Sequence, residues 1–208
     1  MMRIPDITQA EALLQWAEEQ NPTFWATHSR IVAGAARTIA QAVGMDGNAA
    51  YVLGLLHDLG RYEGWTYMRH IYAGYKVLID KGFVDAARIC ITHSFPLQDI
   101  GSYVGDNDQN DCTSDEYIIA KNVLENAVYD DYDRLIQLCD SIAGGTGVVL
   151  MEKRLISVAL RYGTNPMTRA IWQELFNILQ NFSDMVGTGG VYGLFPDAPA
   201  NTFSQARP

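Results

Sequence analysis

Residues 51–61 read YVLGLLHDLGR, an apolar run that leads directly into a histidine, an aspartate and, two positions later, a glycine. The run is typical of a buried helix, which we expect over 49–58. Gly60 lies just beyond that helix, where a residue with left-handed backbone geometry commonly follows the last turn. Neighbouring side chains on a helix point about 100° apart, so His57 and Asp58 share a face only if the helix ends at them. The stretch therefore predicts a helix end at which both side chains can converge on one metal ion.

Most of the remaining chain shows the apolar spacing of amphipathic helices, and no alternating β pattern persists for more than a few residues. Breaks that contain glycine or proline separate the helical segments. Thr8 and Glu11 fit a capping box that opens the first of them. The helices that we expect are 8–19, 24–43, 49–58, 69–81, 84–94, 114–128, 131–143, 149–162 and 166–186. This pattern predicts an all-α fold, a single-domain helical bundle.

Composition divides the chain into three parts. Residues 1–22 hold an N-terminal helix that we expect to pack on the helical domain formed by 23–186. Residues 187–208 are rich in glycine and proline, and we expect them to form a coil tail. Residues 95–113 are a second irregular segment, which is long, polar and acidic. Because long segments without secondary structure are often functional, one hypothesis is that this loop or the tail covers the mouth of a site.

The composition also limits the class of protein. Of the 208 residues, 48% are hydrophobic, which is enough for a sizeable core. The formal net charge is −9 and only 15 Lys and Arg are spread along the chain, which argues against general nucleic-acid binding. The N-terminus has no long apolar segment, and no run approaches the roughly 18 apolar residues that span a bilayer, so we expect no signal peptide and no membrane partner. Three cysteines without a C-x-x-C pair indicate reduced thiols in a cytoplasmic protein, and assembly into a homo-oligomer stays open.

All four histidines fall into one ordered series with two aspartates. The order is His28, then the pair His57-Asp58, then His70, His93 and finally Asp140. Neutral imidazole and carboxylate groups are ligands for first-row metals that activate water. In a helical bundle such a site needs side chains that project inward from several helices, and the series supplies one or two from each of several predicted helices. The sequence therefore predicts a metal centre.

Three segments together resemble the metal-binding pattern of the HD-domain superfamily. They are HSRIVAGAA at 28–36, YVLGLLHDLGR at 51–61 and LCDSIA at 138–143, and the similarity extends from about residue 27 to residue 144. The order H…HD…H…H…D is similar to that of the dinuclear branch of the superfamily. The resemblance implies a helical domain of the HD type that holds two divalent ions, with Fe, Mn, Co, Ni and Zn as candidates. It implies the metal ligands His28, His57, Asp58 and Asp140, with His70 and His93 serving the second ion and Asp58 bridging both.

The resemblance also implies an activity, because superfamily members are mostly phosphohydrolases of nucleotides or other phosphate esters. Two ions can clamp a phosphate and lower the pKa of a water between them. We expect a small phosphorylated molecule as the substrate partner and Asp58 as a catalytic residue. Arg61 is expected to be catalytic and to contact the phosphate, since guanidinium binds phosphate in a bidentate manner. Lys76 is a second candidate for substrate binding, and weaker candidates are Arg69, Lys153, Arg154 and Arg161.

Several alternatives stay open at this point. An HD-fold oxygenase with a di-iron pair has a similar ligand set, and ligand type does not decide between iron chemistry and hydrolysis. A non-catalytic regulatory HD module is the non-enzymatic alternative, although no motif position is degraded here. His70 and His93 fit equally well as groups that orient a single-metal site or contact its substrate. Arg61 fits equally well as a solvent-facing cation at a helix C-terminus.

Overall fold

The computed structural model describes residues 2–103 and 110–203, which form eleven α-helices and two short 3-10 helices without a β-strand. The elements are α1 (Ile7–Gln20), α2 (Trp25–Ala42), α3 (Gly47–Leu56), η1 (Leu59–Glu63), α4 (Arg69–Asp80), α5 (Val84–Thr92), η2 (Ile100–Ser102), α6 (Ser114–Asn126), α7 (Asp131–Ile142), α8 (Met151–Tyr162), α9 (Thr168–Val186), α10 (Gly190–Gly193) and α11 (Ala198–Phe203). The predicted all-α bundle is confirmed, and the nine predicted helices correspond to α1–α9.

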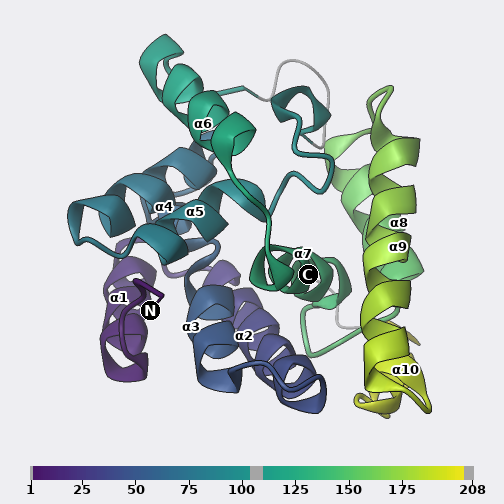
Figure 1. The fold of residues 1–208 in the computed structure, drawn as a ribbon. Helices are drawn as coiled ribbons and strands as arrows, with labels where there is room; N and C mark the ends of the chain where they lie inside the picture. Colours follow the sequence, from purple (N-terminus) through teal and green to yellow (C-terminus); the bar gives the residue numbers. More distant parts are fainter. Residues whose placement is uncertain (1, 104–109, 204–208) are drawn as a thin grey trace.

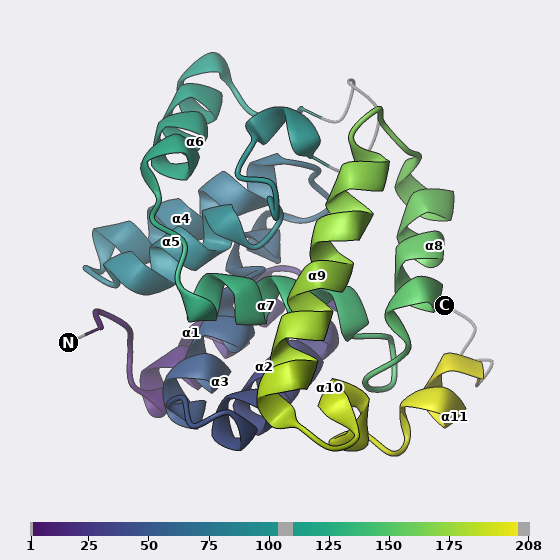
Figure 2. The ribbon, with the colours of Figure 1, turned by 45° about the vertical axis from the view of Figure 1, so that its right-hand side comes forward.

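Helix α7 lies at the centre of the bundle. It packs against α2 and α3 on one side, α5 on another, and α8 and α9 beyond it (Figures 1 and 2). Its side chains Leu135, Leu138, Cys139 and Ile142 are fully buried in the main core. Helices α4 and α5 pack on each other, and α6 covers both from outside. Because α7 contacts so many elements, a side chain on it can meet groups from most of the fold.

Helix α3 is buried on nearly every side, as its sequence predicts. Eight of its ten residues are buried, and Asp46 begins it by accepting hydrogen bonds from the backbone of Asn48 (2.8 Å) and Ala49 (3.1 Å). A helix that is apolar all round must be surrounded by protein. Gly54 lets α2 approach closely, since a Cβ there would lie 2.9 Å from the Cα of Ala33. Because α2 and α3 pack closely, the start of α2 lies next to the end of α3.

Gly60 corrects the first expectation from the sequence. It lies inside η1 rather than adopting a left-handed conformation at a helix end, so that prediction was wrong. Its role is to allow close approach, because a Cβ at this position would lie 1.9 Å from the carbonyl oxygen of His70 and 2.5 Å from the nitrogen of Gly74. Because Gly60 has no side chain, η1 lies directly on the backbone of α4 at His70 and Gly74.

The N-terminal helix begins earlier than expected. Asp6 accepts a hydrogen bond from the backbone of Gln9 (2.8 Å), and the Gln9 side chain accepts one from the backbone of Asp6 (3.0 Å). This capping box replaces the one predicted from Thr8 and Glu11, which was wrong. Helix α1 then packs against α3 and η1, and Tyr51 donates a hydrogen bond to Glu11. Helix α1 thus covers one side of the bundle next to η1.

The expected coil tail was wrong for the described part of 187–208, which forms α10 and α11. Val191 and Ala198 are fully buried in the main core. Tyr192 and Thr202 accept hydrogen bonds from the first two backbone amides at the start of α8, those of Met151 (2.7 Å) and Leu150 (2.8 Å). Glycine and proline here separate short helices that packing stabilises. Residues 204–208 lie outside the described part.

Two further expectations concern loops and membranes. Of the predicted irregular segment 95–113, the structure places η2 and the residues on both sides, while 104–109 lie outside the described residues. The proposed covering role of this segment therefore stays a prediction.

Among the described helices, none combines the length and the apolar character needed to cross a membrane.

Candidate metal centre

The structure brings the six predicted ligands into one cluster around the junction of α3 and η1. The imidazole rings follow one another, with centroids 5.6 Å apart for His28 and His57, 5.0 Å for His57 and His93, and 5.7 Å for His93 and His70. Asp58 lies among three of these rings, and Asp140 lies beside His28. The contributing elements are α2 (His28), the α3–η1 junction (His57 and Asp58), α4 (His70), the end of α5 (His93) and α7 (Asp140).

The helix end at residues 57–58 lets both side chains face one place. His57 keeps helical backbone angles (φ −56°, ψ −37°), whereas Asp58 departs from them (φ −103°, ψ 17°). Without that departure the two side chains would point about 100° apart. The Nε2 atom of His57 instead lies 3.8 Å from Oδ2 of Asp58. The convergence expected from the sequence is present.

Three of the four imidazoles are oriented by the main chain. Each places Nδ1 against the carbonyl oxygen three residues earlier: His57 against Gly54 (2.7 Å), His70 against Tyr67, and His93 against Cys90 (3.0 Å). Because a carbonyl only accepts, Nδ1 must carry the proton, and Nε2 then presents a lone pair. This arrangement is the usual way in which a protein fixes a metal-binding histidine.

The Nε2 atoms and carboxylate oxygens form two overlapping groups. One contains His28, His57 and Asp140 and the other His57, Asp58 and His93, and the ligand atoms within each group lie within 4.8 Å of one another. Nε2 of His57 and Oδ1 of Asp58 are buried and have no hydrogen-bond partner among the described residues. An unpaired buried polar atom costs about 1–3 kcal/mol, and a divalent cation would satisfy both atoms. The residues therefore fit a metal site.

Other contacts in the cluster also bring acceptor atoms together. Nε2 of His70 and Nε2 of His93 lie 3.1 Å and 3.7 Å from Oδ1 of Asp58. Because the protons are on Nδ1, the lone pair on each Nε2 faces the lone pairs of the carboxylate oxygen. A cation between these atoms would remove that repulsion. His70 and His93 accept hydrogen bonds at Nε2 from Arg61 (3.4 Å) and Ser94 (2.9 Å), bonds that ligation would replace.

The charges of the cluster suit metal binding. Burial lowers the pKa of His28 and His70, and lowers that of His93 to about 3, so these three imidazoles stay neutral near neutral pH. Burial alone would raise the pKa of Asp140 and Asp58. Nearby groups outweigh it, chiefly the hydrogen bond from His28 to Asp140 (2.9 Å) and the charge of Arg61 beside Asp58, so each carboxyl pKa lies below its usual range. Neutral imidazoles and ionised carboxylates are the forms that bind metals.

Arg61 points into the cluster. Its Nε lies 3.1 Å from Oδ2 of Asp58, and its Nη1 donates to the carbonyl oxygen of Thr66 (3.0 Å). With Nη2 directed at His70, every nitrogen of the guanidinium has a protein partner. The alternative of a solvent-facing cation was wrong, since the side chain is only 25% exposed. The expected contact with a substrate phosphate would require Arg61 to exchange one of these partners.

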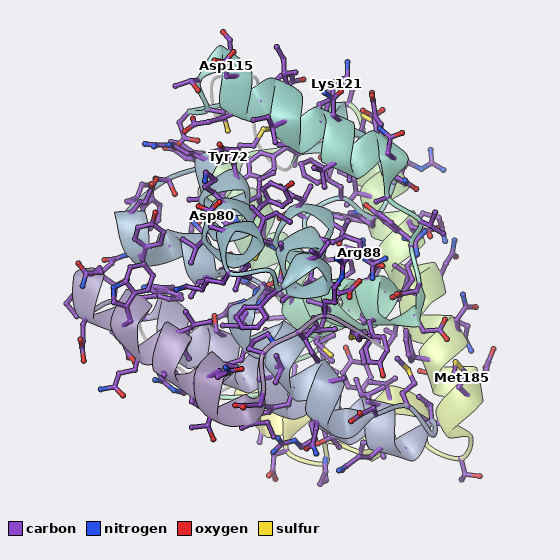
Figure 3. All side chains as sticks on the ribbon, turned by 60° about the vertical axis from the view of Figure 1, so that its left-hand side comes forward. Tyr72, Asp80, Arg88, Asp115, Lys121 and Met185 are labelled. Atoms are coloured by element: carbon purple, nitrogen blue, oxygen red, sulfur yellow. The ribbon has the colours of Figure 1, made fainter. Side chains whose placement is uncertain are left out.

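Lys76 does not join the cluster. It follows His70 by six residues, or about 240° around α4, which places it away from the buried face. Its side chain is 53% exposed and pairs with Asp80, which Figure 3 labels near the end of α4. The structure therefore does not bring Lys76, which was predicted to bind substrate, to this centre.

Several residues near the centre were underrated or missed at the level of sequence. Arg154 of α8, one of the weaker candidates, lies with Nη2 3.8 Å from Oδ1 of Asp140. Tyr103 was missed: it is partly buried, burial raises the pKa of its hydroxyl, and the charges of Arg61 and Asp58 also act on that pKa. Gly54 was also missed, although a glycine within an otherwise apolar helix is a detectable sign of close packing. Arg69 instead pairs with Glu63 and Glu116, at 3.4 Å each.

Comparison with known proteins agrees with this fold and cluster. The sequence model of the HD domain matches residues 25–145, more than half of the chain, and this span includes all six predicted ligands. The chain belongs to the HD-domain family, whose members are mostly metal-dependent hydrolases. No curated protein and no solved structure matches the chain.

Proposed function

We propose that this protein is a metal-dependent phosphohydrolase of a nucleotide or another small phosphorylated metabolite. The single observation that carries the proposal is a pair of buried ligand atoms that have no hydrogen-bond partner among the described residues, Nε2 of His57 and Oδ1 of Asp58, in a cluster of four histidines and two carboxylates. A purely structural cluster would satisfy these atoms internally. Membership of the HD-domain family supports hydrolysis as the reaction.

Two ions are proposed, and Nε2 of His57, with its single lone pair, would serve only one of them. His28, His57 and Asp140 would hold the first ion, and His93 and His70, which lie on the other side of Asp58, would hold the second. When bound, such ions polarise a phosphoryl oxygen and bring the pKa of a coordinated water close to neutrality. Asp58 would be shared by both sets, because its Oδ2 lies 3.8 Å from Nε2 of His57 and its Oδ1 lies 3.1 Å and 3.7 Å from Nε2 of His70 and His93.

The protein residues have separate tasks in this proposal. The carbonyl bonds fix the imidazole rings, so that no reorientation is needed when substrate arrives. Arg61 keeps Asp58 ionised and in place, and we propose that it acts on the reaction through that carboxylate. The largely apolar shell around α3 and α7 limits the access of bulk water, which strengthens electrostatic interactions inside the centre.

The test is phosphate release by protein loaded in turn with Mn²⁺, Fe²⁺, Co²⁺, Ni²⁺ or Zn²⁺, across nucleotides, sugar phosphates and aryl phosphates. Asp58→Asn should reduce kcat at least about 100-fold, because it removes a ligand and a charge. Asp80→Asn makes the same chemical change on an exposed residue and serves as the matched control. Absence of turnover with every metal, or iron-dependent oxygen consumption in place of phosphate release, would contradict the proposal.

A further inference from the structure

Helix α8 lies outside the span matched by the HD-domain family but packs against α7, the helix that carries Asp140 (Figure 2). Its start is fixed firmly. The Val149 amide donates to the carbonyl of Ile142 (2.8 Å), directly linking the connection to the end of α7. Tyr192 and Thr202 accept from the next two amides. The C-terminal segment therefore holds α8 at a defined position relative to Asp140.

Arg154, one turn into α8, is the residue placed against the centre. Its Nη2 lies 3.8 Å from Oδ1 of Asp140, too far for a direct hydrogen bond. Oδ1 already has a closer partner in His28, at 2.9 Å. Nε of Arg154 is buried and has no hydrogen-bond partner among the described residues, although the side chain as a whole is 24% exposed. The guanidinium therefore keeps a donor that no described protein group uses, while part of the side chain reaches solvent.

The contrast with Arg61 separates the roles of the two arginines. Each lies beside one carboxylate of the cluster, Arg61 beside Asp58 and Arg154 beside Asp140. All three nitrogens of Arg61 have protein partners, while the side chain of Arg154 makes one long contact within the described part of the chain. A guanidinium binds two phosphate oxygens only when two N–H groups on one edge are available. Arg154 meets this requirement without giving up a short bond, and Arg61 does not.

We propose that Arg154 is the residue that binds the anionic phosphate group at this centre, in the role that the sequence analysis gave to Arg61. The inference rests on the proposed function, since it assigns the phosphate-binding residue of the same site. Arg154 supplies positive charge next to the His28–Asp140 group in a protein of net charge −9. A phosphate oxygen held there lies on the α8 side of the centre. The C-terminal segment, which fixes α8, thereby takes part in substrate recognition.

The experiment measures binding of inorganic phosphate to Mn²⁺-loaded protein by calorimetry, together with metal content and KM for a hydrolysed ester. Arg154→Met should weaken phosphate binding about 10- to 100-fold, the usual effect of removing a charge-assisted hydrogen bond. Arg154→Lys should retain part of the affinity, because lysine keeps the positive charge but lacks the two parallel N–H donors of the guanidinium. Lys121→Met removes one positive charge from a half-exposed side chain on α6 and should leave the affinity unchanged. Metal content and the circular dichroism melt should match wild type in all three variants.

The outcomes distinguish this inference from the proposed function. Unchanged phosphate affinity and KM in Arg154→Met, in a wild-type protein that does hydrolyse esters, overturn the inference alone. Loss of metal in Arg154→Met also overturns it, because Arg154 would then act by positioning Asp140. Arg154-dependent phosphate binding without hydrolysis of any ester supports the inference and overturns the proposed function. A metal-loaded wild-type protein that binds no phosphate overturns both.

Discussion

Replacing Gly60 by alanine should separate η1 from α4 and damage the metal centre at a distance from its ligands. The added Cβ would lie 1.9 Å from the carbonyl oxygen of His70, where ordinary contact begins near 3.4 Å. Backbone atoms on both sides leave no flexible side chain to move, so the two elements must part by about 1.5 Å, the difference between these distances. Asp58 borders η1 and His70 belongs to α4, so their 3.1 Å contact opens with the gap.

The expected loss of stability is about 1–3 kcal/mol, the usual range for overpacking a well-packed interior. For a chain of this size that corresponds to a decrease in melting temperature of roughly 2–12 °C. The assay is a thermal melt of the metal-free protein, followed by elemental analysis after metal loading. We expect Gly60→Ala to melt earlier and to bind less metal than wild type.

Gly34→Ala is the matched control, because a Cβ at that position on α2 meets nothing within 4 Å. It should leave metal binding unchanged, and since alanine favours helix over glycine it should raise stability by up to about 1 kcal/mol. A Gly60→Ala protein that melts within about 1 °C of wild type and binds the same amount of metal would refute the close-approach reasoning.

Three further predictions concern the ligands and the core. His70→Ala should reduce bound metal from about two ions to about one per chain by elemental analysis; an unchanged stoichiometry would assign His70 to orientation or substrate contact. In the metal-free protein, burial holds the pKa of His93 at about 3, below its ordinary value of 6.5, so the unfolded chain binds a proton first as pH falls. The free energy of unfolding should therefore decrease between about pH 6.5 and pH 3, by up to about 1.4 kcal/mol per unit, and His93→Gln should show a shallower dependence in urea titrations. Asp133→Asn breaks the buried pair with Arg88 (3.2 Å) and should cost about 3 kcal/mol in the same assay, and a loss below about 1 kcal/mol would contradict a stabilising role.

Loss of the buried pair between Arg88 of α5 and Asp133 of α7 would also affect the metal centre. Thr92 donates to Asp133 (2.6 Å), and Gln137 donates to the carbonyl of Thr92 (2.9 Å). Figure 3 shows Arg88 on α5 beside the start of α7. These bonds hold the end of α5 against α7 one residue before His93.

Helix positions could be predicted from the sequence because apolar spacing and local breaks carry that information. The first cap was misplaced because Asp6 with Gln9 and Thr8 with Glu11 both satisfy the same local pattern. The C-terminal helices could not be seen, since α10 and α11 are too short to be stable alone and depend on packing against the core. Gly60 was misinterpreted for a similar reason: its constraint comes from a backbone segment ten residues later.

The ligand cluster could be predicted from the sequence because histidine is rare in this chain and its four copies follow one order. The roles of the arginine side chains were harder to predict. The direction of Arg61 depends on the irregular backbone at Asp58, which no periodicity describes, and the approach of Arg154 depends on the tertiary placement of α8. The exclusion of Lys76 could have been predicted, because a separation of six residues from His70 already places it on another face of a helix.

The carbonyl groups that hold His57, His70 and His93 have a consequence for how the protein tolerates change. Each orienting partner is a main-chain atom, so no ordinary substitution at Gly54, Tyr67 or Cys90 can delete it. A centre that relied on carboxylate side chains for this purpose could lose a ring orientation through one codon. Here the protonation pattern of three imidazoles is a property of the backbone, and random mutation can reach it only by displacing the helices themselves.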